Sequence, residues 1–166
     1  QTLLSRVAVP EYCHGGPKGR SYRSNASAHI TASYVATFDL KSFFPSTKAE
    51  QVFKFFFDDL KCSPDVAGLL TDLCTYQRAL PTGSPVSPLL AFWANHALFS
   101  ALQKRAGEQN LNLSVYVDDV TFSGKTLPSD LVFQVESIVQ KYGQKLSPDK
   151  TRRFGPNSPK HVTGVV

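Results

Sequence analysis

Two short apolar runs meet at a pair of adjacent carboxylates in the sequence Val115-Tyr116-Val117-Asp118-Asp119-Val120-Thr121-Phe122-Ser123. Apolar and polar residues alternate on both sides of this pair, which is strand spacing. Because Asp is a poor strand residue but tolerates turns, the pattern predicts a tight β-hairpin with Asp118 and Asp119 at or beside its tip. An ordinary Asp-rich turn would have the same sequence. Two carboxylates held together also favour a bound cation, and for oxygen ligands that cation is Mg²⁺ or Mn²⁺.

A further carboxylate, Asp39, ends the apolar and β-branched run of residues 34–38 and precedes a helix start. This arrangement predicts that Asp39 lies at the C-terminal end of a strand. If that strand lies beside the hairpin, three carboxylates from distant parts of the chain converge. The other acidic pair, Asp58 and Asp59, ends an apolar helical pattern, and we expect it only to face water.

Several of these stretches resemble the motifs of reverse transcriptases. Residues 34–46 (YVATFDLKSFFPS) resemble motif A, and residues 116–119 (YVDD) resemble the Y-x-D-D of motif C. Between them, residues 80–88 (LPTGSPVSP) resemble motif B, L-P-Q-G-x-x-x-S-P, so the order A, B, C is that of the family. Residues 25–29 (NASAH) and 162–164 (VTG) match two signatures, N-A-x-x-H and V-T-G, of the retron-like bacterial type. The resemblance covers nearly the whole chain.

The predicted order of elements gives the fold class. Periodicity predicts helices over residues 48–60 and 64–74, one long helix after residue 88, and a helix over 131–142. With the strands, this order is βαββαβ, the split βαβ pattern of α+β, ferredoxin-like domains. The resemblance implies a ferredoxin-like polymerase palm with a helical insertion.

The resemblance also implies a domain organisation. Residues 34–166 would form the palm, and residues 1–33 would be a loop region that belongs to partial fingers. The C-terminal thumb of the family is expected to be absent. Since the chain begins with Gln1 and ends inside an apolar run at Val166, we expect it to be a fragment of a longer protein.

The family chemistry assigns roles to the carboxylates. In the family, a primer 3′-hydroxyl attacks the α-phosphate of a nucleotide, and two divalent ions stabilise the attacking and leaving oxygens. By resemblance, Asp39 and Asp118 would bridge two Mg²⁺ ions, for which Mn²⁺ is a possible substitute. Asp119 would be the third, weaker carboxylate ligand, and Leu40 would contribute a backbone carbonyl.

Other positions match the nucleotide site of the family. Phe44 corresponds to the aromatic steric gate that excludes a 2′-hydroxyl, although Phe43 would fill that role if the register slips. Thr82 stands where the family usually has Gln, beside Gly83, in a loop predicted to contact the nucleotide. Lys150 matches the motif D lysine that neutralises or protonates the leaving pyrophosphate. A plain basic surface residue is the competing interpretation of Lys150.

The charge of the chain favours a polyanionic partner. Eighteen Lys and Arg against thirteen Asp and Glu give a formal net charge of +5. A solvated basic face is the competing interpretation, but a basic excess also suits the phosphates of nucleic acid. The candidates for nucleic-acid contact are Lys18 and Arg20 in a Gly-rich loop, and Arg152 and Arg153 in the basic C-terminal part.

Length and composition set the remaining limits. A chain of 166 residues with 42% apolar residues suffices for one compact domain, and no apolar stretch approaches the length of a membrane span. Three cysteines without C-x-x-C spacing support neither a disulfide framework nor a zinc site. We therefore expect a cytoplasmic protein without a membrane partner.

Together the motifs predict an RNA-directed DNA polymerase of the retron type. Its partners would be an RNA template, a DNA primer and product, dNTPs and a structured non-coding RNA. The alternatives are a group II intron-type enzyme, a polymerase of an abortive-infection (antiviral defence) system, or a non-catalytic palm that binds nucleic acid. A nucleotidyl cyclase shares the core and the metals, but it gives no reason for the loop of residues 80–88.

Overall fold

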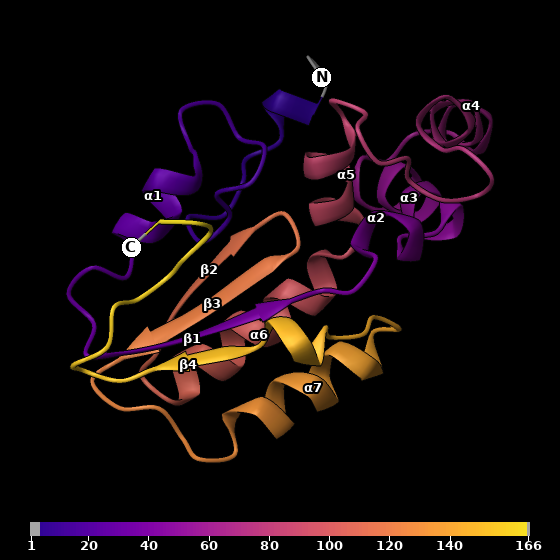
Figure 1. Cartoon of the computed structure of the whole chain (residues 1–166). Coiled ribbons are helices and arrows are strands. Elements are labelled where there is room, and N and C mark those ends of the chain that lie inside the picture. Colours follow the sequence, from indigo (N-terminus) through magenta and orange to yellow (C-terminus); the bar gives the residue numbers. More distant parts are fainter. Residues whose placement is uncertain (1–3, 166) are drawn as a thin grey trace.

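The structure is a computed structural model that describes residues 4–165. In this part of the chain, four strands form one antiparallel sheet in the order β2-β3-β1-β4 (Figure 1). The strands are β1 (Tyr34–Asp39), β2 (Asn112–Tyr116), β3 (Asp119–Gly124) and β4 (Arg152–Phe154). The predicted α+β class is confirmed, since helices and an antiparallel sheet make up the molecule.

Seven α-helices and three short helical turns are found in residues 4–165. The α-helices are α1 (Tyr22–Ser27), α2 (Phe43–Ser46), α3 (Ala49–Lys54), α4 (Pro64–Cys74), α5 (Ser87–Ala94), α6 (His96–Glu108) and α7 (Leu131–Lys141). Short helical turns are η1 (Leu4–Arg6), the π-helical η2 (Phe55–Asp59) and η3 (Pro148–Lys150). In Figure 1, α6 and α7 run along one face of the sheet, and α2 to α5 gather beyond the end of β1.

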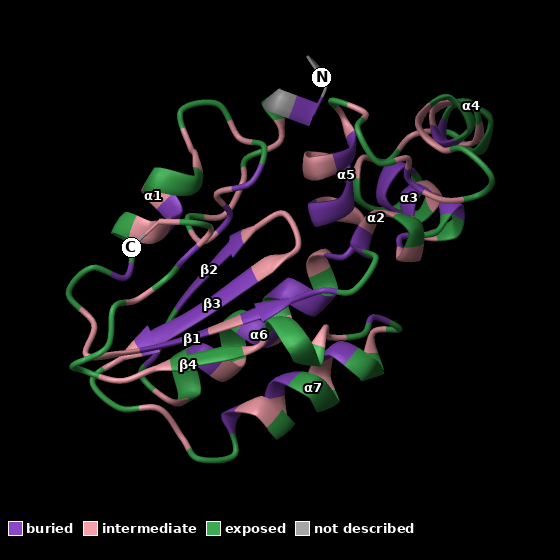
Figure 2. Cartoon of the chain, in the orientation of Figure 1, coloured by how far each residue is buried: buried purple, intermediate pink, exposed green. Residues whose placement is uncertain are grey.

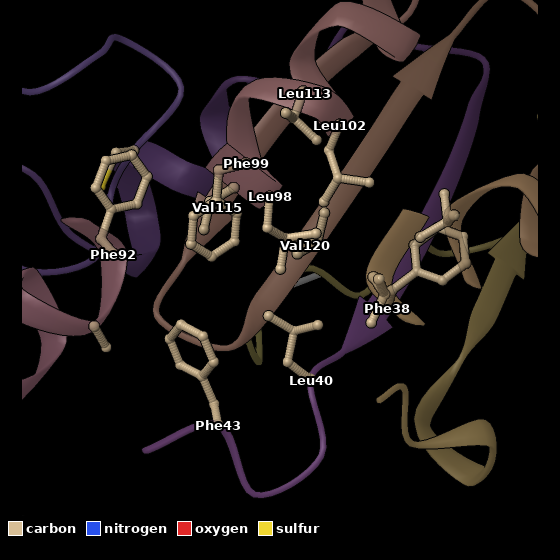
Figure 3. Close-up of a cluster of buried hydrophobic side chains, with 14 of the residues drawn as sticks. Phe38, Leu40, Phe43, Phe92, Leu98, Phe99, Leu102, Leu113, Val115 and Val120 are labelled. Carbon is tan, nitrogen blue, oxygen red and sulfur yellow. The ribbon is translucent and has the colours of Figure 1, made fainter. Parts of the chain in front are cut away.

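The core lies between the sheet and the helices α6 and α7, and it continues into α5. Strands β2 and β3 are almost continuously buried, as Figure 2 shows, because helices or loops cover both of their faces. The ring of Phe38 in β1 meets that of Phe122 in β3 edge to face, with 5.8 Å between centroids. Figure 3 shows Leu40 and Phe43 continuing this core from the end of β1 toward Phe99 in α6. The end of β1 is therefore fixed by packing.

One helix prediction was wrong, and a second was right in extent but not in the type of helix. The single long helix expected after residue 88 is broken into α5 and α6 at Asn95, whose φ and ψ of −113° and 19° are not helical. The helix expected over residues 48–60 leaves the α-helical form after Lys54 and continues as the π-helical turn η2. Both departures lie where side chains from other elements pack or bond, which periodicity does not report.

Helix α4 begins at Pro64, as predicted, but its apolar face is largely exposed. The exposed fractions are 61% for Leu69 and 74% for Leu73, while Ala67 and Thr71 are buried. The helix therefore packs on its small residues rather than on its leucines. Among residues 4–165, we find no helix with the length and apolar character needed to cross a membrane.

The two edges of the sheet differ. Beside β2, Cys13 forms a parallel bridge with Val115, with His14 N–H donating to Val115 O and Val115 N–H donating to Tyr12 O, both at 2.7 Å. At the other edge, β4 is three residues long and exposes Arg152 and Arg153. The N-terminal segment thus lies directly against the strand that leads into the acidic turn.

Candidate active site

The acidic hairpin has the predicted form, with a two-residue turn. Tyr116 at the end of β2 pairs with Asp119 at the start of β3, which leaves Val117 and Asp118 as the turn. Val117 has φ of 60°, a conformation that β-branched residues rarely adopt and that costs about 1–3 kcal/mol. Gly15 packs against this turn so closely that a Cβ at Gly15 would lie 2.4 Å from Val117 N. The turn is therefore held in a strained conformation by its neighbours.

Asp39 lies at the end of β1 and faces the hairpin, as predicted. In the β1–β3 register Asp39 is directly opposite Asp119, and Leu40 N–H donates to Asp118 O at 2.9 Å. Directly opposite residues of an antiparallel pair have side chains on the same face of the sheet. The sheet therefore brings Asp39 together with the adjacent pair Asp118 and Asp119, about 80 positions further along the chain.

The three carboxyl groups influence one another electrostatically. Burial, followed by the charges of Asp118 and Asp39, raises the pKa of the Asp119 carboxyl to about 6. Burial and the Asp39 charge also raise the pKa of Asp118. Like charges in a half-buried place disfavour the ionised form, so this arrangement favours a proton or a cation.

One cation is already present, because Lys150 Nζ lies 2.9 Å from Asp39 Oδ2. This hydrogen bond raises the pKa of the Lys150 ammonium. The preceding loop is tied to the same strand end, since Ser147 N–H donates to Asp39 O at 2.8 Å and Leu146 bridges to Leu40. Lys150, predicted from motif D, therefore lies at the carboxylates rather than elsewhere on the surface.

The donor set suits a hard divalent cation, but it is not a preformed cage. Carboxylate oxygens are the ligands that Mg²⁺ and Mn²⁺ prefer. A cation bound between Asp39, Asp118 and Asp119 would also offset the repulsion among their charges. Within residues 4–165, however, no three His, Cys, Asp or Glu side chains are placed to hold one ion together. An ion would therefore have to draw the carboxylates closer and take Asp39 from Lys150.

The two phenylalanines after Asp39 occupy different environments. Phe43 is buried, and its ring lies 6.0 Å from that of Phe99, whereas Phe44 is half-exposed on α2. Between Phe43 and Phe44, the structure thus gives the core position to the first and the accessible position to the second.

The loop before α5 exposes the residues predicted to contact nucleotide. Thr82 and Gly83 are exposed, and Gly83 has φ of 88°, which favours glycine. Buried Ser87 fixes the base of this loop, because its Oγ donates to Pro81 O at 2.8 Å. The loop tip is therefore accessible while its ends are anchored.

The four basic side chains predicted to contact nucleic acid differ in whether they already make hydrogen bonds within the protein. Lys18 is exposed in the Gly-rich loop. Arg20 donates to the backbone carbonyls of Pro10 and Cys13, so it holds that loop together. Arg152 and Arg153 are exposed on β4, but Arg153 also donates to the carbonyls of residues 127–129. Arg20 and Arg153 therefore have structural partners as well as charge.

The structure also gives a role to the first retron-like signature, which the sequence did not. Buried His29 has its Nδ1 2.6 Å from Ser123 Oγ and its Nε2 2.6 Å from Ser114 Oγ. His29 thereby joins α1 to both strands of the acidic hairpin. The two signatures touch, because Asn25 Nδ2 donates to Thr163 Oγ1 at 3.5 Å. Only the spacing N-A-x-x-H pointed to these residues, and it carries no information about their partners.

A family model described as Reverse transcriptase (RNA-dependent DNA polymerase) matches residues 2–166. The chain belongs to the reverse transcriptase family. This membership confirms the resemblance inferred from motifs A, B and C.

Curated relatives of this chain include several retron reverse transcriptases. The Retron Ec86 reverse transcriptase of Escherichia coli is 33% identical over 171 residues, which cover 100% of this chain and 52% of the relative. The Retron Se72 reverse transcriptase of Salmonella heidelberg (strain 579083-10) is 30% identical, over 90% of this chain and 41% of the relative. The chain thus spans about half the length of these relatives.

A similar fold is found in a solved structure. The apo telomerase from Candida tropicalis, truncated from its C-terminal domain, matches with a TM-score of 0.57 and 14% sequence identity. The match covers 84% of this chain and 34% of the telomerase chain. At this identity the likeness concerns the fold alone.

Proposed function

We propose that the protein is an RNA-directed DNA polymerase of the retron type, in which residues 34–166 are the palm and residues 1–33 contribute to the fingers. The observation that carries the proposal is the register that sets Asp39 opposite Asp119, next to Asp118, in a chain of the reverse transcriptase family. The sheet order β2-β3-β1-β4 supports a ferredoxin-like palm.

In this proposal the acidic residues hold two divalent ions, Mg²⁺ or Mn²⁺. When bound, such ions stabilise the charge on the attacking and leaving oxygens of a phosphoryl transfer. The carboxylates of Asp39, Asp118 and Asp119, together with the backbone carbonyl of Leu40, would hold the ions. Lys150, whose ammonium lies beside these carboxylates, would neutralise or protonate the leaving pyrophosphate.

The neighbouring residues orient the nucleotide and the primer-template. The accessible ring of Phe44 packs against the sugar and leaves no room for a 2′-hydroxyl, so deoxynucleotides are selected by a clash. Thr82 and Gly83 contact the nucleotide from the loop before α5. Basic residues draw in the phosphates of the RNA template and the DNA product, and these residues are Lys18, Arg20, Arg152 and Arg153.

The template is proposed to be a structured non-coding RNA, copied from a primer with dNTPs in the cytoplasm. The names of the two relatives favour the retron type over the intron and abortive-infection types. The presence of all three carboxylates in one register argues against a palm that only binds nucleic acid. The loop of residues 80–88 argues against a nucleotidyl cyclase.

The proposal is tested by primer extension on an RNA template with dNTPs and Mg²⁺, using the full-length protein that contains this chain. We expect the wild type to extend a DNA primer and Asp118→Asn to reduce the rate by about a thousandfold or more, since metal ligands supply several kcal/mol of transition-state stabilisation. Asp58→Asn is the matched control, because Asp58 is an exposed acid of the other acidic pair. Extension that is unchanged in Asp118→Asn would refute the metal-dependent mechanism.

A further inference from the structure

A buried polar side chain sits where α5 breaks from α6. The amide of Asn95 is 4% exposed and has four hydrogen-bond partners. Its Oδ1 accepts from Gln51 Nε2 at 3.0 Å and from Gln144 Nε2 at 3.1 Å. Its Nδ2 donates to Thr47 Oγ1 and to Ala91 O, both at 2.9 Å. Two donors and two acceptors are all that such an amide offers, so Asn95 is fully bonded.

The bond to Thr47 leads to the nucleotide side of the candidate site. Thr47 is fully buried and ends α2, and its Oγ1 donates to Phe43 O at 3.0 Å. The backbone of Thr47 also accepts from Leu80 N–H at 3.1 Å, where the loop of residues 80–88 begins. One residue bonded to Asn95 therefore anchors both the helix that carries Phe44 and the loop that carries Thr82 and Gly83.

The bond to Gln144 leads to the Lys150 side. Gln144 is 2% exposed and follows α7. The next residue, Lys145, accepts from Lys41 N–H at 2.8 Å, and Ser147 N–H donates to Asp39 O at 2.8 Å. This loop ends in η3, where Lys150 meets Asp39. The position of Lys150 thus depends on a loop whose buried side chain is bonded to Asn95.

We propose that Asn95 is a positioning residue that sets the Phe44 helix, the loop of residues 80–88 and the Lys150 loop in one fixed arrangement. The inference deepens the proposed polymerase function and depends on it. Gln144 Oε1 is buried without a partner, but the amide of Asn95 has a partner for each of its donors and lone pairs. Moving any of the three segments would therefore leave a buried donor or acceptor of Asn95 unpaired. The network touches no carboxylate of the site, so it acts on nucleotide placement through Thr47 and Gln144.

The break between α5 and α6 is consistent with this role. An apolar residue at position 95 would pack without any need for partners, whereas the amide requires donors and acceptors from three other elements. Thr47 and Gln51 belong to neighbouring segments at the end of α2 and in α3, whereas Gln144 lies in the loop after α7, more than 90 residues further along the chain. Their common partner is the amide of Asn95.

Three near-isosteric variants test the proposal. Thr47→Val removes the hydroxyl that accepts from Asn95, and Gln144→Met removes the donor on the other side. Gln109→Met is the matched control, because Gln109 also donates through Nε2 to a single amide oxygen, that of Gln134 on α7, at 2.6 Å. The measured quantities are the KM for dNTP, kcat, the ratio of ribonucleotide to deoxynucleotide incorporation, and hydrogen exchange at the Leu80 amide.

We expect Thr47→Val and Gln144→Met each to raise the KM for dNTP by about tenfold, the scale of a small misplacement of substrate, and to raise ribonucleotide incorporation. The control should match the wild type in both parameters. A distinctive result is faster exchange of the Leu80 amide in Gln144→Met, because these two residues are joined only through Asn95 and Thr47 in the bonds described above.

Values for Thr47→Val and Gln144→Met that equal those of Gln109→Met would overturn the proposal. A wild type that fails to extend any primer would instead refute the proposed function. In that case hydrogen exchange decides about the network alone: faster exchange at Leu80 in Gln144→Met supports a positioning role, and unchanged exchange refutes it.

Discussion

The ammonium of Lys150 lies 2.9 Å from Oδ2 of Asp39, and this places an internal cation on the carboxylate that β1 directs toward the hairpin. A divalent ion that needs the same oxygen must displace the ammonium. Lys150 is mostly exposed, so displacement costs little desolvation. The ammonium of Lys150 therefore offsets part of the repulsion among the three carboxyl groups.

This relationship predicts opposite effects of one substitution on binding and on rate. In Lys150→Gln, Mn²⁺ should bind several times more tightly, because no ammonium competes for Asp39. The rate of primer extension should fall by about tenfold to a hundredfold, the range of a lost general acid. Electron paramagnetic resonance of free Mn²⁺ measures the first effect and single-turnover extension the second.

Lys141→Gln is the control for this pair of effects, since Lys141 is exposed at the end of α7. It should change neither quantity. Weaker Mn²⁺ binding in Lys150→Gln would contradict the competition between the ammonium and the ion.

The environments of Phe43 and Phe44 predict which ring selects the sugar. Phe44→Val should raise ribonucleotide incorporation by about tenfold or more, because removing a ring opens space for a 2′-hydroxyl. Competition between a dNTP and the matching rNTP measures this ratio. Phe57→Val is the control, since Phe57 is 40% exposed on η2. If the ratio rises equally in both variants, Phe44 is not the gate.

The close approach of Gly15 to the acidic turn predicts a sensitive position outside the motifs. Gly15→Ala would bring a methyl group to 2.4 Å from Val117 N and 2.8 Å from Val117 Cγ2, so the turn has to move. We expect a loss of about 1–3 kcal/mol in unfolding free energy and a lower extension rate. Gly68→Ala is the control, because no atom lies within 4 Å of its added Cβ. Equal stability of the two variants in urea would show that the turn tolerates the methyl group.

Buried His29 predicts a pH dependence of stability. Burial, and then the charge of His14, lowers the pKa of His29 from 6.5 to about 4. A lowered folded-state pKa stabilises the protein above pH 6.5, and this contribution is lost as the pH falls toward 4. By linkage the wild type should lose about 3 kcal/mol from this residue between pH 7 and pH 4.

His29→Gln tests this dependence, because glutamine does not titrate. At pH 7 the variant should be less stable by about 1–3 kcal/mol, since two buried serine hydroxyls lose their partner. At pH 4 the difference should vanish or reverse. Urea unfolding at both pH values measures it, and a difference that stays constant with pH would refute the buried neutral histidine.

The sheet and its acidic turn could be predicted from local sequence. Alternation of apolar and polar residues around Asp118 and Asp119 predicted the hairpin, and the β-branched run before Asp39 predicted the adjacent strand. Successive side chains of a strand point to opposite faces of the sheet, so burial of one face produces this alternation in the sequence. The order of the motifs added the family. Local pattern and chain order thus sufficed for the elements that bring the carboxyl-bearing residues together.

The supporting contacts could not be predicted in this way. The break at Asn95 depends on partners 44 to 49 residues away, and His29 depends on hydroxyls 85 and 94 residues away. The bonds from the guanidinium of Arg20 to two carbonyls of its own loop were likewise not visible in the sequence. Such bonds between distant segments leave no periodic trace in the sequence.

The bridge between Cys13 and Val115 has a consequence for the behaviour of the molecule in concentrated solution. A sheet edge with unpaired amides and carbonyls is a template for intermolecular pairing, and here residues 12–14 cap part of that edge beside β2. At the opposite edge, the short β4 strand carries two arginines that repel an approaching copy. Residues 12–14 therefore also protect the edge of β2 from aggregation. Removing these residues would expose the edge of β2 to pairing with a strand of another molecule.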